Sequence, residues 1–143
     1  MAFLDIKAAY DQVDRSILWR KLSEKGMPDN LLGTLRALFD QNSSCIVVRG
    51  KSSREFRINS GLLQGSPLSP ILYSTFINDF VGTLDRESAV GGVKLNGRRF
   101  NCLLYADDIV LVANDPMSLT KLLEAAEYHS AQNRYLYNIG KCR

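Results

Sequence analysis

The sequence predicts an α+β fold in which helices pack on one face of an antiparallel sheet. Apolar segments of strand length are joined by short turns, so that neighbouring strands form hairpins. Helical segments lie between these hairpins without the strict alternation of strand and helix that produces a parallel sheet. The 143 residues contain no internal repeat or low-complexity tract, and this length fits one domain.

The N-terminal part predicts one strand followed by two helices. Residues 2–4 form a short apolar run of the kind that makes a strand. Asp14 is a suitable N-cap for a helix that ends at Gly26. Apolar residues between Leu31 and Phe39 recur with a period close to 3.6, which indicates a second helix with one buried face.

A hairpin is expected after these helices. Residues 45–48 are apolar and predict a strand, residues 50–53 suit a turn, and residues 56–58 alternate as a returning strand. The hairpin carries four basic side chains, Arg49, Lys51, Arg54 and Arg57. They could contact a phosphate backbone, but a solvated charged face is the favoured interpretation.

A loop and one helix are predicted in the middle of the chain. Residues 61–70 contain two glycines and two prolines. Ser66-Pro67 and Ser69-Pro70 each offer an N-cap residue followed by a proline at the first helical position. The helix beyond them is expected to bury Leu72, Phe76, Phe80 and Leu84.

The C-terminal third predicts further strands and a final helix. Asn96-Gly97 is a turn signal between apolar segments. Asp115-Pro116 opens a helix that carries His129, the only histidine, which is expected to be structural or exposed. The expected strands are residues 93–95, 102–104 and 109–112, with a short last one near 135–137.

Charge, cysteines and hydropathy limit the possible functions. A net charge of +3 is compatible with a polyanionic partner but does not require one. Three cysteines without CxxC spacing favour an intracellular location, and Cys45 and Cys102 are expected to be small buried hydrophobes. No apolar run approaches the roughly 20 residues of a membrane-spanning helix, so no membrane partner is expected.

Asp107 and Asp108 are two adjacent acids inside an otherwise apolar hairpin. A tight turn would place them at its tip, where like charges repel and raise each other's pKa. A divalent cation would remove this repulsion and create a metal site. Such a pair on its own is more typical of a solvated turn, but the buried-strand residues on both sides weaken that interpretation.

Asp5 supplies a third carboxylate at the end of an apolar strand. Read alone, it could equally be a turn or capping residue. Together with the adjacent pair it completes the ligand set of a site for two Mg²⁺ ions about 4 Å apart, because Mg²⁺ prefers carboxylate and phosphate oxygens.

Four segments resemble motifs A to D of reverse transcriptases in order and spacing: Phe3–Asp11, Gly61–Pro70, Tyr105–Asp108 and Asn138–Cys142. The segment Tyr-Ala-Asp-Asp alone is a weak signal, but the ordered set covers nearly the whole chain. It is most similar to the enzymes of non-LTR retrotransposons and group II introns. The resemblance implies that residues 1–143 are a partial polymerase palm domain, with fingers and thumb largely outside it.

The resemblance also implies roles for the carboxylates and for the C-terminal lysine. Asp5 and Asp107 would bind both metal ions, and Asp108 would complete the catalytic triad. Lys141 would protonate the leaving pyrophosphate or neutralise its charge. Mn²⁺ could substitute for Mg²⁺.

Further residues are implied to bind the incoming nucleotide. The Ile6 carbonyl would contact the nucleotide-side metal, and the N–H groups near Ala8 and Ala9 would face the triphosphate. Tyr10 would act as a steric gate beneath the sugar, where a 2′-hydroxyl would clash. In the middle loop, Gln64 would contact the nucleotide and Gly65 would let the backbone approach it closely.

The function that follows is RNA-directed DNA synthesis, in which a primer 3′-hydroxyl attacks a deoxynucleoside triphosphate opposite an RNA template. An RNA-dependent RNA polymerase shares the carboxylates, but a bulky Tyr10 argues for exclusion of the 2′-hydroxyl. The alternative from another class is a non-catalytic retroelement fragment or nucleic-acid-binding remnant.

Overall fold

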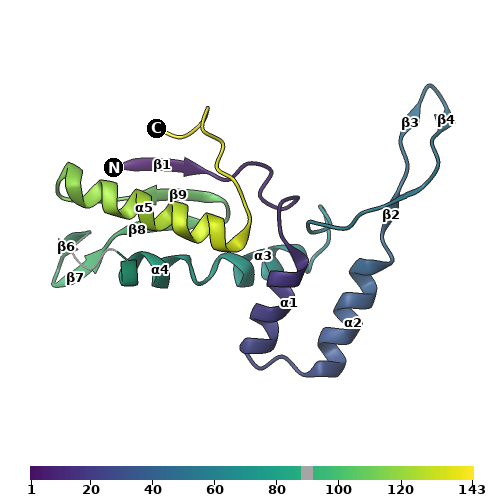
Figure 1. Cartoon of the computed structure of the whole chain (residues 1–143), viewed down its shortest axis with the longest axis horizontal. Coiled ribbons are helices and arrows are strands. Elements are labelled where there is room, and N and C mark those ends of the chain that lie inside the picture. The colour runs from purple at the N-terminus through teal and green to yellow at the C-terminus, as the bar shows by residue number, and fades with distance from the viewer. Residues whose placement is uncertain (88–91) are drawn as a thin grey trace.

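The computed structural model describes residues 1–87 and 92–143 and contains a three-stranded antiparallel sheet (Figure 1). Its strand order is β1 (Ala2–Asp5), β9 (Asp108–Leu111), β8 (Cys102–Tyr105). Ala2 lies opposite Leu111, and Asp5 lies opposite Asp108. The first and last thirds of the sequence therefore meet in the central strand pair.

One face of this sheet is buried and the other is open. Leu4 and its partner Ile109 are buried, whereas Phe3 and Leu103 point to the opposite face and are more than half exposed. Helices α4 (Phe80–Glu87) and α5 (Pro116–Asn133) pack on each other against the buried face. The predicted α+β arrangement with helices on one face is confirmed.

Three further helices form the second part of the core. They are α1 (Arg15–Glu24), α2 (Asp29–Asp40) and α3 (Ser69–Ile77), and α1 packs against both of the others. The Asp14 carboxylate accepts hydrogen bonds from the N–H groups of Ser16 and Ile17, as expected of an N-cap. Gly26 follows the helix with φ of +83°, which suits glycine.

The prediction of a single helix in the middle of the chain is wrong. It is broken into α3 and α4 at Asn78-Asp79, because the Asp79 carboxylate is drawn to Lys21 and His129, at 2.6 and 3.1 Å. Ser69 is not an N-cap either: it lies in the first turn of α3, and its hydroxyl donates to the Leu63 carbonyl over 2.6 Å.

The turn at Asn96-Gly97 joins a different pair of strands from those expected. Both residues have positive φ, and they connect β6 (Val93–Leu95) directly to β7 (Arg98–Phe100). A two-residue turn of this kind places the next strand immediately after it. The strand that starts at Cys102 therefore belongs to the main sheet.

The basic hairpin projects away from the body of the molecule as an arm of residues 43–57 (Figure 1). Its short strands are β2 (Ser43–Ser44), β3 (Val47–Val48), β4 (Lys51–Ser52) and β5 (Phe56–Arg57). Cys45 is exposed here, contrary to prediction, because the arm has no core to bury it. Cys102 is half-buried beside the core of the main sheet.

The C-terminal segment runs along the outer edge of β1. Phe3 and Arg143 exchange backbone hydrogen bonds of 2.6 and 3.0 Å, and Tyr137 forms a bridge with Ile6. These bonds satisfy an edge that would otherwise be unpaired. No helix in residues 1–87 or 92–143 combines the length and hydropathy required to cross a membrane.

Candidate active site

Two of the three predicted metal-binding carboxylates lie opposite each other across the strand pair. Asp5 ends β1 and Asp108 begins β9, and the two residues are direct cross-strand partners. Their side chains point to the open face of the sheet, since the neighbouring pair Leu4 and Ile109 points to the core. Like charges in this position are destabilising, so folding alone does not explain the pair.

Asp107 lies in the two-residue turn that joins β8 to β9. The residue before it, Ala106, has φ of +52°, a conformation that costs a non-glycine residue about 1 kcal/mol or more. Asp107 is half-buried and Asp108 is exposed. The predicted position of the acid pair at the tip of a tight hairpin is confirmed, and the turn directs the two side chains differently.

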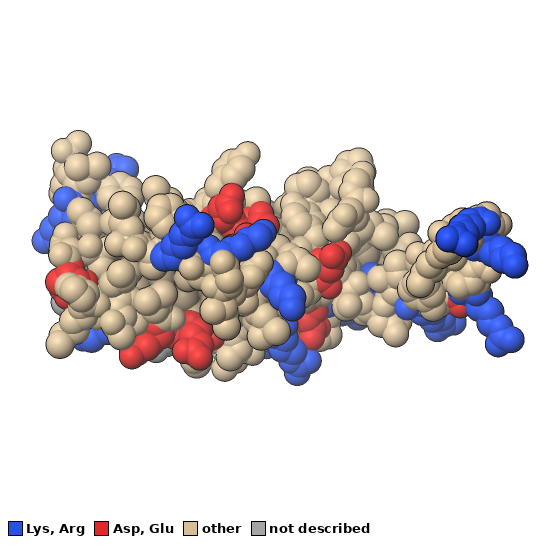
Figure 2. All heavy atoms as spheres, turned by 90° about the horizontal axis from the view of Figure 1, so that it is seen from above, with Lys and Arg blue, Asp and Glu red and all other residues tan. Residues whose placement is uncertain are grey.

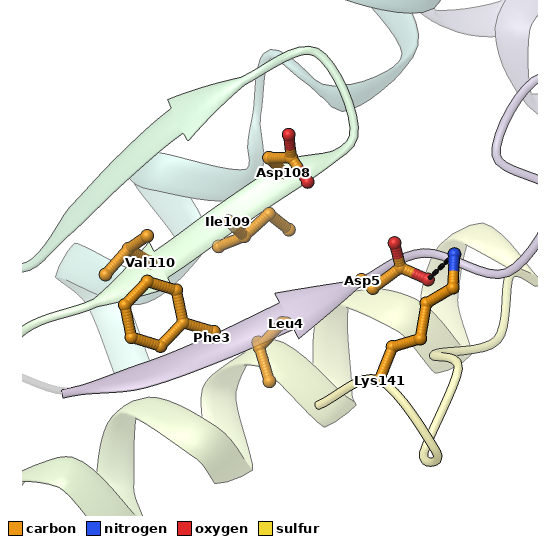
Figure 3. A pocket seen from close by; sticks show the side chains of 7 residues that line it. All are labelled: Phe3, Leu4, Asp5, Asp108, Ile109, Val110 and Lys141. Carbon is orange, nitrogen blue, oxygen red and sulfur yellow. Dashed lines mark ion pairs between the residues drawn. The ribbon is translucent and has the colours of Figure 1, made fainter. Parts of the chain in front are cut away.

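Lys141 is brought to the same place from the far end of the chain. Its ammonium lies 3.6 Å from an Asp5 carboxylate oxygen, and both residues line a surface hollow together with Asp108 (Figure 3). Backbone bonds hold this contact: the Asn138 N–H donates to the Asp5 carbonyl, and the Lys141 N–H donates to the Asn138 carbonyl.

The donor atoms suit a hard divalent cation, but the side chains are not arranged as a closed metal site. Carboxylate oxygens are the protein ligands that Mg²⁺ prefers. Within the described part of the chain, no three His, Cys, Asp or Glu side chains lie close enough together to hold one ion. The Lys141 ammonium partly neutralises the negative charge of the Asp5 carboxylate. A metal ion that binds this carboxylate would therefore compete with the lysine.

Three of the six predicted nucleotide-binding residues lie together in a second hollow. Tyr10, Gln64 and Gly65 line it together with the two Ser-Pro pairs of the middle loop. The Gln64 amide donates to the Asp11 carboxylate over 3.3 Å. Gly65 has φ of +85° with open space where a side chain would be, so its backbone is accessible.

The turn after β1 contains the other predicted nucleotide contacts. Ile6 and Ala9 have buried side chains, whereas Ala8 is exposed. Ala8 has φ of +45°, and its carbonyl accepts from the N–H groups of Asp11 and Gln12. Ala8 follows the strand that ends at Asp5, and Ala106 precedes Asp107, so two of the non-glycine residues with positive φ lie next to the acids in sequence.

Hydrogen bonds that the sequence did not predict connect the segment Phe3–Asp11 and the residues that follow it to the loop that begins at Gly61. The Gly61 N–H donates to the Val13 carbonyl over 2.9 Å, and the Leu62 N–H donates to the Tyr10 carbonyl over 2.8 Å. On the other side, Arg15 is buried and donates to the Gly61 carbonyl. These residues fix where Tyr10 and Gln64 lie relative to one another.

Tyr73 is a second residue that sequence reasoning missed. It is buried on α3, and its ring stacks on that of Tyr10 with 4.8 Å between the centroids. Burial raises the pKa of its hydroxyl far above the ordinary value, and the nearby Asp107 carboxylate raises it further. Tyr73 lies outside the apolar helix stripe predicted from the sequence, so no local pattern indicated its contact with Tyr10.

Matches to known proteins agree with this arrangement. The family model described as "Reverse transcriptase (RNA-dependent DNA polymerase)" matches residues 1–143. The chain belongs to the reverse transcriptase family. Members of this family generally use divalent metal ions and act on an RNA template with nucleotide substrates.

Retrotransposon proteins are among the similar sequences. The chain is 31% identical over 124 residues to the Pol polyprotein from the type-2 retrotransposable element R2DM of Drosophila melanogaster, covering 87% of the chain and 11% of the relative. It is 28% identical to the R2 polyprotein of Popillia japonica, covering 87% and 18%. The chain thus spans less than a fifth of these relatives.

A solved structure supports the fold assignment. The structure of apo telomerase from Candida tropicalis matches with a TM-score of 0.75 and 15% identity, over 99% of this chain and 29% of the telomerase chain. The reverse transcriptase resemblance and the palm-like α+β fold predicted from the sequence are confirmed.

Proposed function

We propose that this chain provides the catalytic palm of an RNA-directed DNA polymerase. The observation that carries the proposal is the pairing of Asp5 with Asp108 on the open face of the sheet, with Asp107 in the adjoining turn. A related protein, 28% identical over 142 residues, is named RNA-directed DNA polymerase from the mobile element jockey. Because the chain spans 14% of that relative, the activity is proposed for the longer protein that carries this domain.

The three acids would hold two Mg²⁺ ions, or Mn²⁺ in their place, with Asp5 and Asp107 binding both ions. When bound, these ions activate the primer hydroxyl and neutralise charge on the reacting phosphate. The protein's own part is to supply hard oxygens at fixed places. Asp5 and Asp108 do so from neighbouring strands, whose backbone hydrogen bonds set the spacing of their side chains.

Around the acids, the chain would bind and select the nucleotide. Tyr10 would place its ring beneath the sugar and exclude a 2′-hydroxyl, which favours deoxynucleotides over the ribonucleotides of an RNA polymerase. Gln64 and Gly65 line the same hollow and would contact the nucleotide. The Ile6 carbonyl and the N–H groups near Ala8 and Ala9 would face the triphosphate from the turn after β1.

Lys141 would act on the leaving group. Its ammonium lies within reach of the acids and is well exposed, so it can exchange its contact with Asp5 for one with the pyrophosphate. There it would donate a proton or neutralise developing charge.

The arm supports contact with nucleic acid. Figure 2 shows Lys and Arg side chains gathered at the end of the molecule that the arm occupies. The cations Arg49, Lys51, Arg54 and Arg57 are all exposed. Such a cluster suits the phosphates of an RNA template or a DNA primer. It would equally serve a non-catalytic nucleic-acid-binding module, and the intracellular location expected from the cysteines suits both.

Primer extension tests the proposal, with this chain compared with a version extended at both ends. In the active version, Asp107→Asn should lower Mg²⁺-dependent extension by about 1,000-fold or more without changing the fold or the affinity for primer–template. The matched control is Glu124→Gln, which neutralises an exposed acid on α5. Undiminished extension by the Asp107 variant would reject the metal assignment, whereas binding without extension in every version favours the non-catalytic module.

The steric gate is tested separately in the active version. Tyr10→Ala should raise incorporation of ribonucleotides relative to deoxynucleotides, because the space beneath the sugar opens. If that ratio stays unchanged, Tyr10 only packs against its neighbours.

A further inference from the structure

Tyr73 supports the side of Tyr10 that faces the core. The two rings are nearly parallel, with an interplanar angle of 17° and 4.8 Å between centroids. Tyr73 is 2% exposed, and its ring also contacts that of Phe76, with 6.4 Å between the two ring centroids. Tyr10 is half-buried and lines the hollow that contains Gln64 and Gly65. The position of the Tyr10 ring therefore depends on a fixed aromatic surface beneath it.

The Tyr73 hydroxyl has no partner to account for its presence. In residues 1–87 and 92–143 it is a fully buried side-chain polar atom without a hydrogen bond. Burying a hydroxyl in this way is unfavourable, and phenylalanine would fill the same space without that cost. Burial raises the pKa of this hydroxyl, and the charge of the Asp107 carboxylate raises it further, so the two groups influence each other electrostatically. A hydroxyl near an acid can donate to it once the carboxylate turns.

We propose that Tyr73 is a positioning residue for the nucleotide and metal sites. Its ring holds the Tyr10 ring at the height that excludes a 2′-hydroxyl, and its hydroxyl donates to the Asp107 carboxylate when that carboxylate binds a cation. The inference rests on the function proposed above and assigns it a residue outside the four sequence motifs.

Two substitutions separate the two parts of this proposal. Tyr73→Phe keeps the ring and removes the hydroxyl, whereas Tyr73→Leu removes the stacked ring. Phe80→Leu is the matched control, since Phe80 is also buried but contacts His129 edge-to-face. Any effect of general core loosening should be shared by the two leucine variants.

The ring part is measured first without relying on activity. In the 143-residue chain labelled with 3-fluorotyrosine, the Tyr10 resonance is assigned through Tyr10→Phe. Tyr73→Leu should shift and narrow this resonance, and Tyr73→Phe and Phe80→Leu should leave it in place. In the active, extended version, Tyr73→Leu should raise ribonucleotide incorporation relative to deoxynucleotides by about tenfold. An unchanged Tyr10 resonance in a folded Tyr73→Leu chain overturns this part. Should Tyr73→Leu fail to fold, Tyr73→Met is read by the same criterion.

The hydroxyl part is measured with Mn²⁺, whose free concentration is read by electron paramagnetic resonance. Without metal, Tyr73→Phe should melt at the same or a higher temperature, because an unpaired polar group is removed. The same variant should bind Mn²⁺ about tenfold more weakly, as expected when a partner of a metal ligand is lost. Unchanged Mn²⁺ affinity overturns this part.

These results are distinguishable from failure of the proposed function. If the wild-type chain binds no Mn²⁺ and the extended version makes no DNA, the proposed metal site fails, and the hydroxyl part fails with it. The ring part is still decided by the Tyr10 resonance, which requires neither metal nor catalysis.

Discussion

The Arg15 guanidinium donates to the Gly61 carbonyl over 2.8 Å, and this bond connects α1 to the loop that carries Gln64. Arg15 is 6% exposed, and its cation lies 5.3 Å from the centre of the Phe39 ring. It also donates to the backbone carbonyls of Phe39, Ile58 and Ser60. One side chain therefore fixes the end of α2, the base of the arm and the start of the loop whose residues Gln64 and Gly65 line a hollow with Tyr10.

Arg15→Lys should lower the free energy of unfolding by about 2–4 kcal/mol. A lysine cannot reach four carbonyl groups in a fixed fork, so several buried acceptors lose their partners. Urea denaturation followed by circular dichroism measures the change. Arg20→Lys is the control, because Arg20 is exposed and its contact with Glu24 is 4.0 Å long. If both variants lose the same stability, the Arg15 hydrogen bonds contribute little.

Gly61→Ala should be more damaging than its size suggests. The new Cβ would lie 2.8 Å from both the Cα and the carbonyl oxygen of Asp11, and Gly61 has φ of +77°. Backbone cannot yield as a flexible side chain can, so we expect a loss of about 2–4 kcal/mol and a separation of Tyr10 from Gln64.

Gly33→Ala is the matched control for this substitution. Gly33 lies within α2, and apart from the adjacent residues and the helix's own backbone a Cβ there would meet no atom of the described residues within 4 Å. The helix should gain up to about 1 kcal/mol of stability. Equal effects at the two glycines, measured by urea denaturation, would contradict the tight approach of Gly61 to Asp11.

The sequence predicted correctly those structural features that are determined by residues adjacent in the chain. The Asp14 cap with Gly26 at the helix end, and the tight turn at Asp107, follow from properties of a few adjacent residues. The positions of Asp5 and Asp108 next to apolar strand segments, together with the motif resemblance, predict that they belong to one site, and the strand register shows them as direct partners. That Asp5 and Asp108 belong together could therefore be predicted, but their direct pairing across the two strands could not.

The predictions that failed depend on contacts between residues distant in sequence. The helix break at Asp79 arises from Lys21 and His129, which lie 58 and 50 positions away. Cys45 was expected to be buried because its neighbours are apolar, yet the arm stands clear of the core. The stacking of Tyr73 on Tyr10 likewise needs the packing of α3 against the turn after β1, which no local pattern specifies.

Because of Asp79, the stability of the fold should depend on pH in the acidic range. Burial opposes its ionisation, but hydrogen bonds from His129 and Lys21 outweigh burial and hold the pKa of Asp79 well below 3.8. An acid with a lowered pKa in the folded state stabilises the fold above its unfolded pKa, and this contribution is lost as pH falls below it. The melting temperature should therefore decrease from about pH 4 downward.

Asp79→Asn should reduce the decrease of the melting temperature below about pH 4. It should also lower the stability at neutral pH. Thermal unfolding followed by circular dichroism between pH 2 and pH 7 measures both effects. Glu124→Gln serves as the control, because that side chain is exposed on α5. If the melting temperature of the Asp79 variant decreases with falling pH as steeply as that of the wild type, other carboxylates cause the decrease.

The arm should bind nucleic acid through its charges. Replacing Arg49, Lys51, Arg54 and Arg57 by alanine should weaken binding of a single-stranded RNA and reduce its dependence on salt. Each lost phosphate contact lowers the slope of log affinity against log salt by about 0.7, so the full set should lower it by up to about 3. Fluorescence anisotropy at several salt concentrations measures the slope on this 143-residue chain.

The control for the arm removes the same charge elsewhere. Four exposed lysines and arginines outside the arm serve this purpose: Lys25, Arg36, Lys94 and Lys121. If the arm contacts phosphates, its variant loses far more affinity and slope than this control of equal net charge. Equal losses would mean that binding responds only to overall charge, because a diffuse field does not distinguish where the cations lie. The exposed cations of the arm would then be a solvated face, and another surface near Asp5 and Asp108 would have to hold the template.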